Sequence, residues 1–429
     1  MAVEWRNWAG DQVCTPLELA TPATRDELAT VIARARLGGQ RVRVAGAGHS
    51  FTEAALTDGT MVSLARMDRL LDADPATGLV RVEAGIQLHA LNERLWDLGL
   101  AMENLGDIDV QSLAGAISTA THGTGSALRN ISAQVEAVEL MTAEGEVREL
   151  SGGDELRAAR VSLGALGVIT AVTLRTVPAF TLHRVDSPQP LADVLARFEE
   201  VADANDHFEL FVFPYTERAL VIERNRTEDP PKPPGRAAAW LNDVLLENIT
   251  LDLLARTGRR FRSLNPRLAR VASRLLSHSE RRDRSYRIFA TERRVRFTEM
   301  EYALPREHGP EALRRVLELI RERRVEVFFP IEFRVVAGDD ALLSPTHERP
   351  SAYIAVHQYN GMQWRGYFEA VETIMRSYGG RPHWGKRHFQ DAASLAQVYP
   401  RFADFQAVRD EYDPKRLFAN EYTERVLGP

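Results

Sequence analysis

The stretch Gly46-Ala47-Gly48-His49-Ser50 directly follows a short apolar strand that we expect at Val42-Arg43-Val44-Ala45. Its glycines let the backbone turn and bring N–H groups against phosphate oxygens, which a side chain would obstruct. The dinucleotide fingerprint of doubly wound folds needs a third glycine and a helix that opens at once. Phe51 stands in the place of that glycine, and the chain turns again at Asp58-Gly59. The stretch therefore favours a phosphate-binding loop or an ordinary turn over a nicotinamide site.

A second glycine-rich stretch is small and hydroxylated throughout, and it reads Ser112-Leu113-Ala114-Gly115-Ala116-Ile117-Ser118-Thr119-Ala120-Thr121-His122-Gly123-Thr124-Gly125-Ser126. Small residues permit close approach of a ligand to the backbone, and hydroxyls supply hydrogen-bond donors. A tightly packed turn among strands would explain the glycines. It would not explain the run of Ser and Thr beside His122.

Together with Leu163-Gly164-Ala165-Leu166-Gly167-Val168-Ile169-Thr170, these two stretches resemble the flavin domain of the vanillyl-alcohol-oxidase family. The resemblance implies bound FAD, with the first loop gripping the pyrophosphate and His49 joined covalently to the 8α carbon of the flavin. Without it, His49 would be read as a core histidine. The cofactor-binding residues that it implies are Ala45, Gly46, Ala47, Gly48, His49, Ser50, Ser112, Gly115, Ser118, Thr121, His122, Gly123, Gly125, Gly167 and Ile169.

A third informative stretch, His383-Trp384-Gly385-Lys386-Arg387-His388, follows a proline that ends the preceding predicted helix. Near a flavin, Lys386 would stabilise the negative charge that reduction places over N1 and C2=O. It is therefore a candidate for both cofactor binding and catalysis. Taken alone, the stretch would be a surface loop with a basic patch.

Three segments narrow the resemblance, which covers nearly the whole chain: Pro382–Lys386, Phe297-Thr298-Glu299-Met300-Glu301-Tyr302-Ala303-Leu304-Pro305 and the tail Asp413–Tyr422. They are similar to the aldonolactone oxidoreductase and alditol oxidase branch, which includes gulonolactone, galactonolactone and arabinonolactone oxidases. In that branch a Glu-x-Arg pair on a cap strand faces the flavin, and Glu332 and Arg334 match it. Strand alternation puts both on one face, where they can share the hydroxyls of a polyol between acceptor and donors. An ordinary salt bridge is the alternative.

The predicted catalytic residues are Glu332, Arg334, His357 and Lys386, and the same four with Ser112 are predicted to bind substrate. His357 is a candidate to accept the proton of the substrate hydroxyl, although a hydrogen-bonded core histidine fits its strand nearly as well. Ser112 matches a serine that touches both flavin and substrate in the alditol oxidases.

The resemblance implies an FAD-linked enzyme that oxidises an alcohol carbon of a small sugar derivative by hydride transfer to flavin N5. Dioxygen, giving hydrogen peroxide, or another electron acceptor would reoxidise the flavin. An aldono-1,4-lactone is the expected substrate, and an alditol such as xylitol or sorbitol is the alternative. A nucleoside-like alcohol, or FAD binding without turnover, remains open, and the Glu332 and Arg334 pair argues against the last.

The expected fold class is α+β, with a two-part FAD-binding domain of the vanillyl-alcohol-oxidase type and a substrate cap whose antiparallel sheet is covered by helices. We expect the FAD-binding domain over 1–178, the cap over 179–380 and a C-terminal segment over 381–429 that returns to the flavin. Strands are expected at 80–84, 135–142, 147–150, 168–176, 182–185, 208–213, 219–224, 295–304, 325–336 and 352–357. Helices are expected at 24–36, 88–98, 191–204, 310–323 and 365–378.

A Pro-rich linker at 228–235 precedes a predicted helical insertion at about 235–290. Within it, residues 256–287 carry eleven arginines against two acids. Such a stretch could bind anionic lipid, but solvated arginines on amphipathic helices explain it better in a chain with a net charge of −6.

The same net charge makes nucleic acid an unexpected partner. The single cysteine, Cys14, excludes internal disulfides and multi-cysteine metal sites, and no metal is expected. Residues 1–8 lack an apolar signal core, and no run of about 18 apolar residues occurs, so we expect a cytoplasmic protein without a transmembrane segment.

Overall fold

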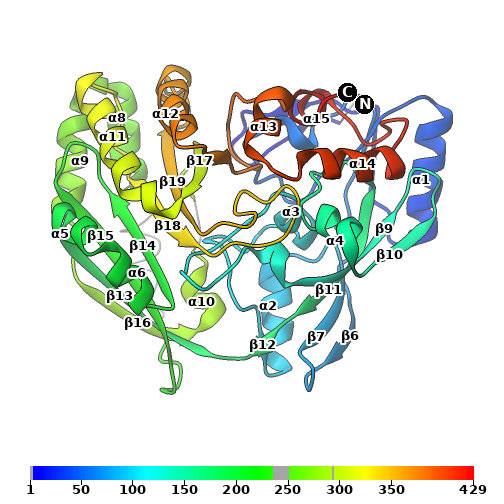
Figure 1. Cartoon of the computed structure of the whole chain (residues 1–429), viewed down its shortest axis with the longest axis horizontal. Helices are drawn as coiled ribbons and strands as arrows, with labels where there is room; N and C mark the ends of the chain where they lie inside the picture. The colour runs from blue at the N-terminus through cyan, green and yellow to red at the C-terminus, as the bar shows by residue number, and fades with distance from the viewer. Residues whose placement is uncertain (1–2, 234, 236–250, 292–293) are drawn as a thin grey trace.

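The computed structural model describes residues 3–233, 235, 251–291 and 294–429. Figure 1 shows two halves, each with its own sheets, and the N- and C-termini lie close together in one of them. The fold mixes helices with mainly antiparallel sheets, and the predicted α+β class is confirmed. None of the described helices combines the length and the apolar content that a bilayer span requires.

The half that holds both termini is built on two sheets. A five-stranded antiparallel sheet has the order β10 (Val147–Leu150), β9 (Val135–Met141), β11 (Val168–Arg175), β7 (Leu79–Glu83) and β6 (Leu70–Asp74). A parallel sheet has the order β3 (Glu18–Ala20), β5 (Thr60–Val62) and β4 (Val42–Val44). Strand β4 ends where the glycine-rich loop begins, so the sheet fixes the start of that loop.

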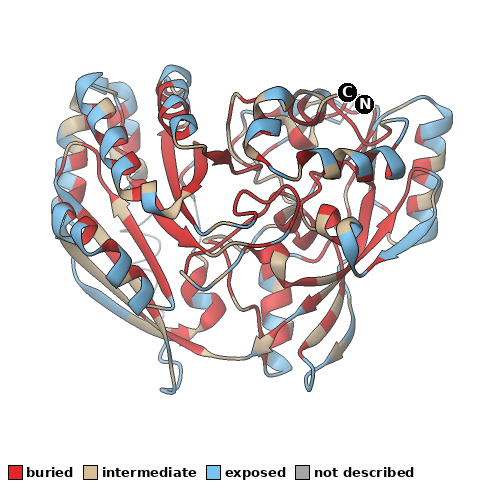
Figure 2. Cartoon of the chain, in the orientation of Figure 1, coloured by how far each residue is buried: buried red, intermediate tan, exposed pale blue. Residues whose placement is uncertain are grey.

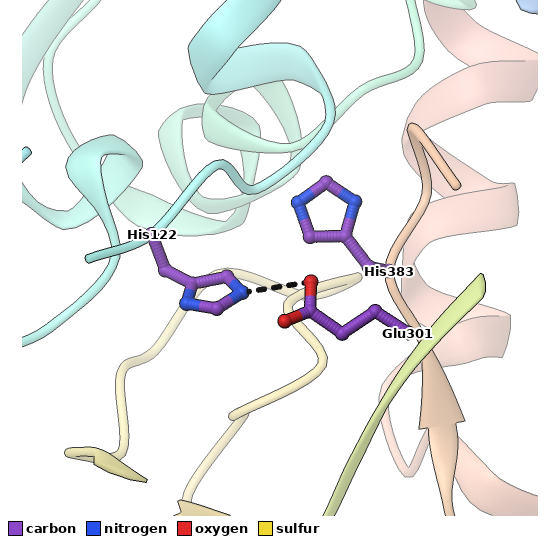
Figure 3. Close-up of side chains that lie close together, drawn as sticks. All are labelled: His122, Glu301 and His383. Atoms are coloured by element: carbon purple, nitrogen blue, oxygen red, sulfur yellow. Dashed lines mark hydrogen bonds and ion pairs between the residues drawn. The ribbon is translucent and has the colours of Figure 1, made fainter. Parts of the chain in front are cut away.

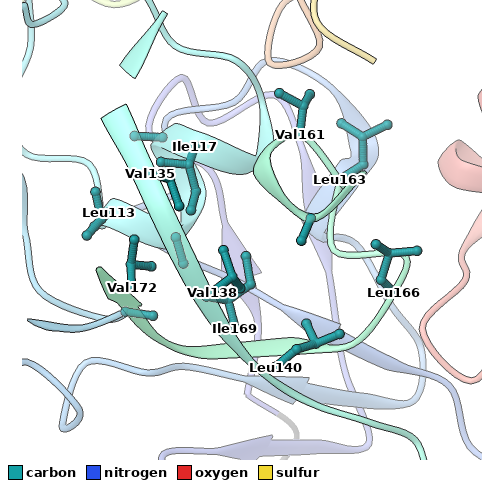
Figure 4. Packing of buried hydrophobic residues seen from close by; sticks show 14 of the residues in the cluster. Leu113, Ile117, Val135, Val138, Leu140, Val161, Leu163, Leu166, Ile169 and Val172 are labelled. Carbon is teal, nitrogen blue, oxygen red and sulfur yellow. The ribbon is translucent and has the colours of Figure 1, made fainter. Parts of the chain in front are cut away.

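The helices of this half are α1 (Arg25–Leu37), α2 (Leu88–Asp97), α3 (Leu113–Ser118) and α4 (Gly153–Arg160), and its short strands are β1 (Trp5–Arg6), β2 (Val13–Cys14), β8 (Leu100–Ala101) and β12 (Val177–Pro178). Helix α1 begins as predicted, because the Thr24 hydroxyl accepts a hydrogen bond from the Glu27 amide at 3.2 Å. Gly38 caps its end, and Gly39 has a positive φ of 65°. Apolar side chains between α3 and the five-stranded sheet form a buried core (Figure 4).

The second half is one eight-stranded antiparallel sheet. Its order is β16 (Ser279–Arg284), β13 (Thr181–Pro190), β15 (Arg218–Thr227), β14 (His207–Val212), β18 (Ile331–Val336), β19 (Ser351–Tyr359), β17 (Phe297–Pro305) and β20 (Arg381–Pro382). Figure 2 shows buried strands under helices whose outer faces are exposed. Those helices are α5 (Leu191–Ala196), α6 (Phe198–Ala204), α8 (Leu251–Arg260), α9 (Asn265–Arg274), α11 (Gly309–Glu322) and α12 (Arg365–Ser377).

Three predicted elements differ from the structure. The helix expected at 191–204 breaks at Arg197, whose φ of −115° and ψ of 20° separate α5 from α6. The strand expected at 325–336 begins only after Pro330. Part of the arginine-rich stretch is not helical, because residues 279–284 form the edge strand β16, with α10 (Ser285–Phe289) after it. Residues 236–250, near the start of the predicted insertion, lie outside the described residues.

The C-terminal segment returns to the first half. Helices α13 (Ala392–Val398), α14 (Phe402–Tyr412) and α15 (Glu421–Leu427) lie beside the N-terminal elements in Figure 1, and their apolar side chains belong to the same core. Trp384 is fully buried there, and its Nε1 donates to the Leu343 carbonyl oxygen at 2.6 Å. Because β20 pairs with β17, the loop after Pro382 runs directly over the edge of the large sheet. This pairing brings the loop after Pro382 close to β17.

Candidate active site

The glycine-rich loop borders a cavity of about 450 Å³, which we call the glycine-rich cavity. The loop contributes residues 44–50, and the second glycine-rich stretch contributes Ser112, Gly115, Ser118 and Thr119. The third stretch adds Gly167 and Ile169. The three glycine-containing stretches, which are far apart in the sequence, therefore face one space.

The backbone of this cavity fits a diphosphate. Among the described residues, none of the five amides at 46–50 donates a hydrogen bond to a protein acceptor, and all five residues line the cavity. Gly48 has a φ of 72°, where glycine is favoured. A Cβ at Gly46 would collide with the Ser112 hydroxyl. A row of unpaired N–H groups without side chains is a typical anion site, so the residues present can hold the pyrophosphate of a dinucleotide.

Five of the predicted cofactor-binding residues lie elsewhere, and one of them, Lys386, lines the second cavity described below. Thr121 and His122 border a second cavity. Gly123 and Gly125 border neither cavity. A Cβ at Gly123 would collide with the Leu105 carbonyl oxygen, and Gly125 donates its amide to the Val335 carbonyl oxygen at 2.7 Å. Close backbone packing accounts for both glycines.

Arg43, on the strand that precedes the glycine-rich loop, fixes the position of this strand through hydrogen bonds. It was not predicted from the sequence as part of the site. It lies on β4 with its guanidinium fully buried, and it donates to the carbonyl oxygens of Ala54, Leu163 and Phe418 at 2.8, 2.8 and 2.5 Å. Burial, with Arg409 nearby, lowers its pKa to about 10. One side chain thereby ties β4, where the glycine-rich loop begins, to the third glycine-containing stretch and to the C-terminal segment.

A second cavity of about 180 Å³ adjoins the first, and we call it the acidic chamber. The two cavities share the lining residues His49, Ser50, Gln111 and Thr119. The chamber brings together the four predicted catalytic residues, which come from β18, β19 and the loop after β20. Its apolar wall consists of Trp8, Phe51, Ile108, Phe211, Val295, Phe297, Phe329 and Pro330. Ser112 lines only the glycine-rich cavity.

Arg334 lies among three carboxylates. Its Nε donates to Glu209 at 3.0 Å, and its terminal nitrogen contacts Asp107 and Glu332. Arg224 balances part of this charge through Glu209, at 2.5 Å. Burial raises the pKa of Glu332 well above its ordinary value, and Asp107 and Glu209 raise it further against the pull of Arg334. Glu332 is therefore suited to donate a hydrogen bond as a neutral acid.

Lys386 lies between the carboxylates of Glu299 and Glu301, which are two residues apart on one face of β17. Its Nζ donates to Glu299 Oε1 at 2.5 Å and to Glu301 Oε2 at 2.6 Å. Burial acts to raise the pKa of Glu299, but Lys386 and His357 outweigh burial and lower it to about 2. The two carboxylates likewise raise the pKa of Lys386 against the effect of burial. The lysine is thus a fixed ammonium ion.

Two histidines of the chamber have acceptors at both ring nitrogens. His357 lies 3.1 Å from the Pro330 carbonyl oxygen and 3.2 Å from Glu299 Oε1. His122 lies 2.8 Å from the Gly123 carbonyl oxygen and 3.2 Å from Glu301 Oε2, and it stacks on Tyr353 at 3.7 Å. In this arrangement both ring nitrogens of His357 already have contacts within the protein.

His383 lies next to His122 and Glu301 (Figure 3). Its Nδ1 accepts a hydrogen bond from the Gly385 amide at 3.0 Å, and burial with Lys386 nearby lowers its pKa to about 3. These three residues form one of three clusters among the described residues whose geometry could hold a metal ion. In every cluster a carboxylate already binds Lys386 or Arg334, so the cation position is taken by protein.

His49 lies where the two cavities meet. Its ring stacks on Trp8 with 5.2 Å between centroids and an interplanar angle of 23°. Burial lowers its pKa to about 4, so the imidazole is neutral at pH 7. A neutral ring nitrogen is the form that can bond to an electrophilic carbon.

Sequence reasoning did not assign Glu299, Glu301, Asp107, Glu209 or Trp8 to the site. The alternation of Glu299 and Glu301 on one predicted strand was a signal that could have identified them, because a buried strand face rarely carries two acids without a partner. Asp107 and Glu209 have no distinguishing sequence context. Only the pairing of β14 with β18 brings Glu209 opposite Arg334.

Two protein families match the chain. The family model of D-arabinono-1,4-lactone oxidase matches residues 172–426, and the FAD binding domain matches residues 16–151.

Similar proteins span the full length of the chain. An L-gulono-1,4-lactone dehydrogenase from Mycobacterium tuberculosis is 54% identical over 100% of both chains. An L-gulonolactone oxidase from Bos taurus is 35% identical over 99% of this chain and 98% of its own. An alditol oxidase from a Streptomyces species is 33% identical over 100% of both. Among solved structures, a solvent-stable cholesterol oxidase superposes with a TM-score of 0.87 at 19% identity, over 100% of this chain and 98% of its own, which establishes a common fold.

Proposed function

Because this chain belongs to the D-arabinono-1,4-lactone oxidase family, we propose that it is an FAD-dependent oxidoreductase that oxidises an alcohol carbon of an aldono-1,4-lactone. The observation that carries the proposal is the acidic chamber, which gathers the four predicted catalytic side chains beside the glycine-rich cavity. Relatives from Mycobacterium tuberculosis and cattle are named for L-gulono-lactone, so that lactone is the first substrate to test.

We assign the glycine-rich cavity to FAD. The unpaired amides at 46–50 would hold its pyrophosphate, and His49 would bond to the flavin ring system. When bound, FAD supplies the hydride acceptor for the carbon that is oxidised. The division into an FAD-binding unit over 1–178, a cap over 179–380 and a returning segment over 381–429 follows from the same assignment. The position of the C-terminal helices in the first core supports it.

The chain's own residues would bind and orient the sugar. Glu332, as a neutral acid, and Arg334 present donors toward substrate oxygens. Two of the three N–H groups of Lys386 donate to carboxylates, and the third can donate to a ligand. The aromatic wall packs on the C–H face of the sugar and excludes water. Together they fix the reacting C–H bond toward the glycine-rich cavity.

An alditol is the second candidate substrate. The alditol oxidase relative spans the whole chain, and a polar pair that binds lactone hydroxyls also suits an open-chain polyol. The flavin would be reoxidised by dioxygen or by another electron acceptor. Both are candidates, because one relative is named a dehydrogenase and another an oxidase.

The test is a substrate panel on the purified flavoprotein, with aldonolactones, alditols and nucleosides. Peroxide formation and dye reduction are read in parallel for each. We expect the highest kcat/KM with an aldono-1,4-lactone. If kcat/KM is highest with an alditol or a nucleoside, that compound class replaces the lactone as the assigned substrate. If none of these compounds reduces the flavin, the proposed enzymatic activity is rejected. Glu318→Gln, on the exposed face of α11, serves as the control variant.

A further inference from the structure

Glu299 has one carboxylate oxygen that accepts no hydrogen bond from a described residue, a feature it shares with Glu301, whose Oε1 lacks a partner, and with Glu332, whose contact with Arg334 is made at Oε1. Both of its side-chain contacts are made at Oε1, with Lys386 at 2.5 Å and with His357 at 3.2 Å. Among the described residues, no group donates to Oε2. Glu299 lines the acidic chamber, whereas Glu301 does not. An acceptor oxygen therefore remains available to whatever fills the chamber.

The carboxylate of Glu299 stays ionised. Lys386 and His357 hold its pKa near 2 in spite of burial, so it carries its charge throughout the neutral range. The side chain is only 7% exposed, and water screens that charge weakly. A ligand in the chamber thus meets a fixed negative oxygen.

The cations of the chamber are already compensated. Arg334 contacts three carboxylates, and Lys386 contacts two. Burial lowers the pKa values of His49 and His383 to about 4 and about 3, so both rings are neutral. The described lining residues offer N–H donors to a neutral oxygen but no uncompensated positive charge to an anion.

We propose that Glu299 is a specificity-determining residue that selects neutral polyhydroxylated substrates and excludes their anionic relatives. Its Oε2 accepts a hydrogen bond from a substrate hydroxyl, while the same charge repels a carboxylate such as the aldonate formed when a lactone ring hydrolyses. The inference rests on the proposed function, because it concerns the substrate of that site. Under this proposal the charge of Glu299 lets the site distinguish a lactone from the aldonate that forms when the lactone ring hydrolyses.

The test compares gluconate and gluconamide, two ligands with the same carbon skeleton, of which only gluconate is charged. Their binding to the flavin-loaded enzyme is measured by anaerobic equilibrium dialysis at pH 7. We expect the wild type to bind gluconamide at least tenfold more tightly than gluconate. In Glu299→Gln the ratio should fall below threefold, because the neutral amide keeps the shape and loses the charge. Glu318→Gln should keep the wild-type ratio.

Glu299→Asp provides the second variant, for the case that the glutamine variant loses its flavin. The shorter side chain keeps the charge but withdraws Oε2 from the chamber, so the ratio should stay above tenfold while gluconamide binds several-fold more weakly. Equal binding of both ligands to the wild type would overturn the inference. So would an unchanged ratio in Glu299→Gln, or unchanged gluconamide affinity in Glu299→Asp.

The two proposals fail separately in these experiments. Turnover of a lactone together with equal binding of gluconate and gluconamide would remove only the role of Glu299. A clear preference for gluconamide without turnover of any lactone or alditol would remove only the proposed reaction.

Discussion

Lys386 and Glu301 are 85 residues apart in the sequence, yet Nζ of the lysine lies 2.6 Å from Oε2 of the glutamate inside the protein. Pairing of β20 with β17 explains the contact, because it carries the loop after Pro382 back along the strand that holds Glu301. With Glu299 on the same strand face, one ammonium group meets two carboxylates. The charge beside the proposed flavin is therefore set by three residues.

The first prediction is that Lys386→Met and Glu301→Gln shift the flavin midpoint potential in opposite directions. Removing the ammonium disfavours the negatively charged reduced flavin, whereas removing one carboxylate favours it. We expect a shift in midpoint potential of several tens of millivolts for each variant, since about 30 mV corresponds to ~1.4 kcal/mol for a two-electron couple. Spectroelectrochemical titration measures the potentials.

Sulfite binding provides the independent check, because the sulfite adduct of flavin N5 carries the same negative charge. Lys386→Met should bind sulfite less tightly, and Glu301→Gln more tightly. Unchanged potential and unchanged sulfite affinity in Lys386→Met would show that the lysine does not face the flavin.

The second prediction is that the flavin stays attached to the denatured protein through His49. The ring is neutral because burial lowers its pKa to about 4, and it lies where the two cavities meet. The protein band in denaturing electrophoresis should fluoresce, and that of His49→Ala should not. A yellow folded protein whose denatured band is dark would rule out the covalent bond while leaving the FAD assignment intact.

The third prediction separates the two members of the Glu-x-Arg pair. Arg334→Ala should slow flavin reduction by about 10²–10⁴-fold, because it removes a group that orients the substrate. Glu332→Gln should slow it less, because the amide keeps a neutral hydrogen-bond donor. Their stabilities should differ. Glu332→Gln imitates a neutral acid and changes the free energy of unfolding little, whereas Arg334→Ala leaves buried carboxylates unpaired and costs about 3–5 kcal/mol.

Stopped-flow reduction and denaturant unfolding measure these two quantities on the same preparations. Wild-type reduction rates in both variants would reject the pair as part of the site. A large loss of stability in Glu332→Gln would show instead that Glu332 is ionised.

The sequence predicted the parts of the site that depend on local pattern. Gly46 and Gly48 predicted a phosphate-binding loop, and strand alternation placed Glu332 and Arg334 on one face. Both are short-range signals that survive folding, because a turn needs glycine where it turns and a strand alternates wherever it pairs. The resemblance supplied Lys386 and His357, and the structure places both in the same chamber.

The partners of these residues could not be predicted, because they depend on which strands become neighbours. Glu209 reaches Arg334 only through the pairing of β14 with β18, a connection across more than one hundred residues. Strand β16 was missed for a similar reason. Its charged residues favour no regular element by themselves, and the edge of β13 imposes the strand on them.

The fourth prediction concerns acid stability. The pKa of Glu299 is about 2 in the folded protein, below its ordinary value of 4.5, so the residue stabilises the fold above pH 4.5. That contribution is lost as the pH falls from 4.5 toward 2. One pKa unit is worth about 1.4 kcal/mol, which makes the full loss on the order of 3 kcal/mol.

Urea unfolding of the wild type and of Glu299→Gln across this pH range measures the effect as a difference. The stability gap between the two proteins should be widest above pH 5 and should narrow as the pH falls. A gap that stays constant down to pH 2 would show that Glu299 titrates normally.

The last prediction tests whether Gly46 serves packing or a ligand. A Cβ at this position would collide with the Ser112 hydroxyl, so Gly46→Ala should destabilise the protein. Adding Ser112→Ala removes the colliding oxygen and should restore most of the stability, less about 1 kcal/mol for the lost N-cap of α3, where Ser112 accepts from the Gly115 amide at 3.3 Å. If the bare amides at 46–50 hold a pyrophosphate, the double variant should still bind FAD at least tenfold more weakly than Ser112→Ala alone, because the methyl group keeps the phosphate away. Thermal unfolding and flavin content report the two quantities separately. Recovery of stability and full flavin content together would mean that Gly46 is needed only to make room for Ser112.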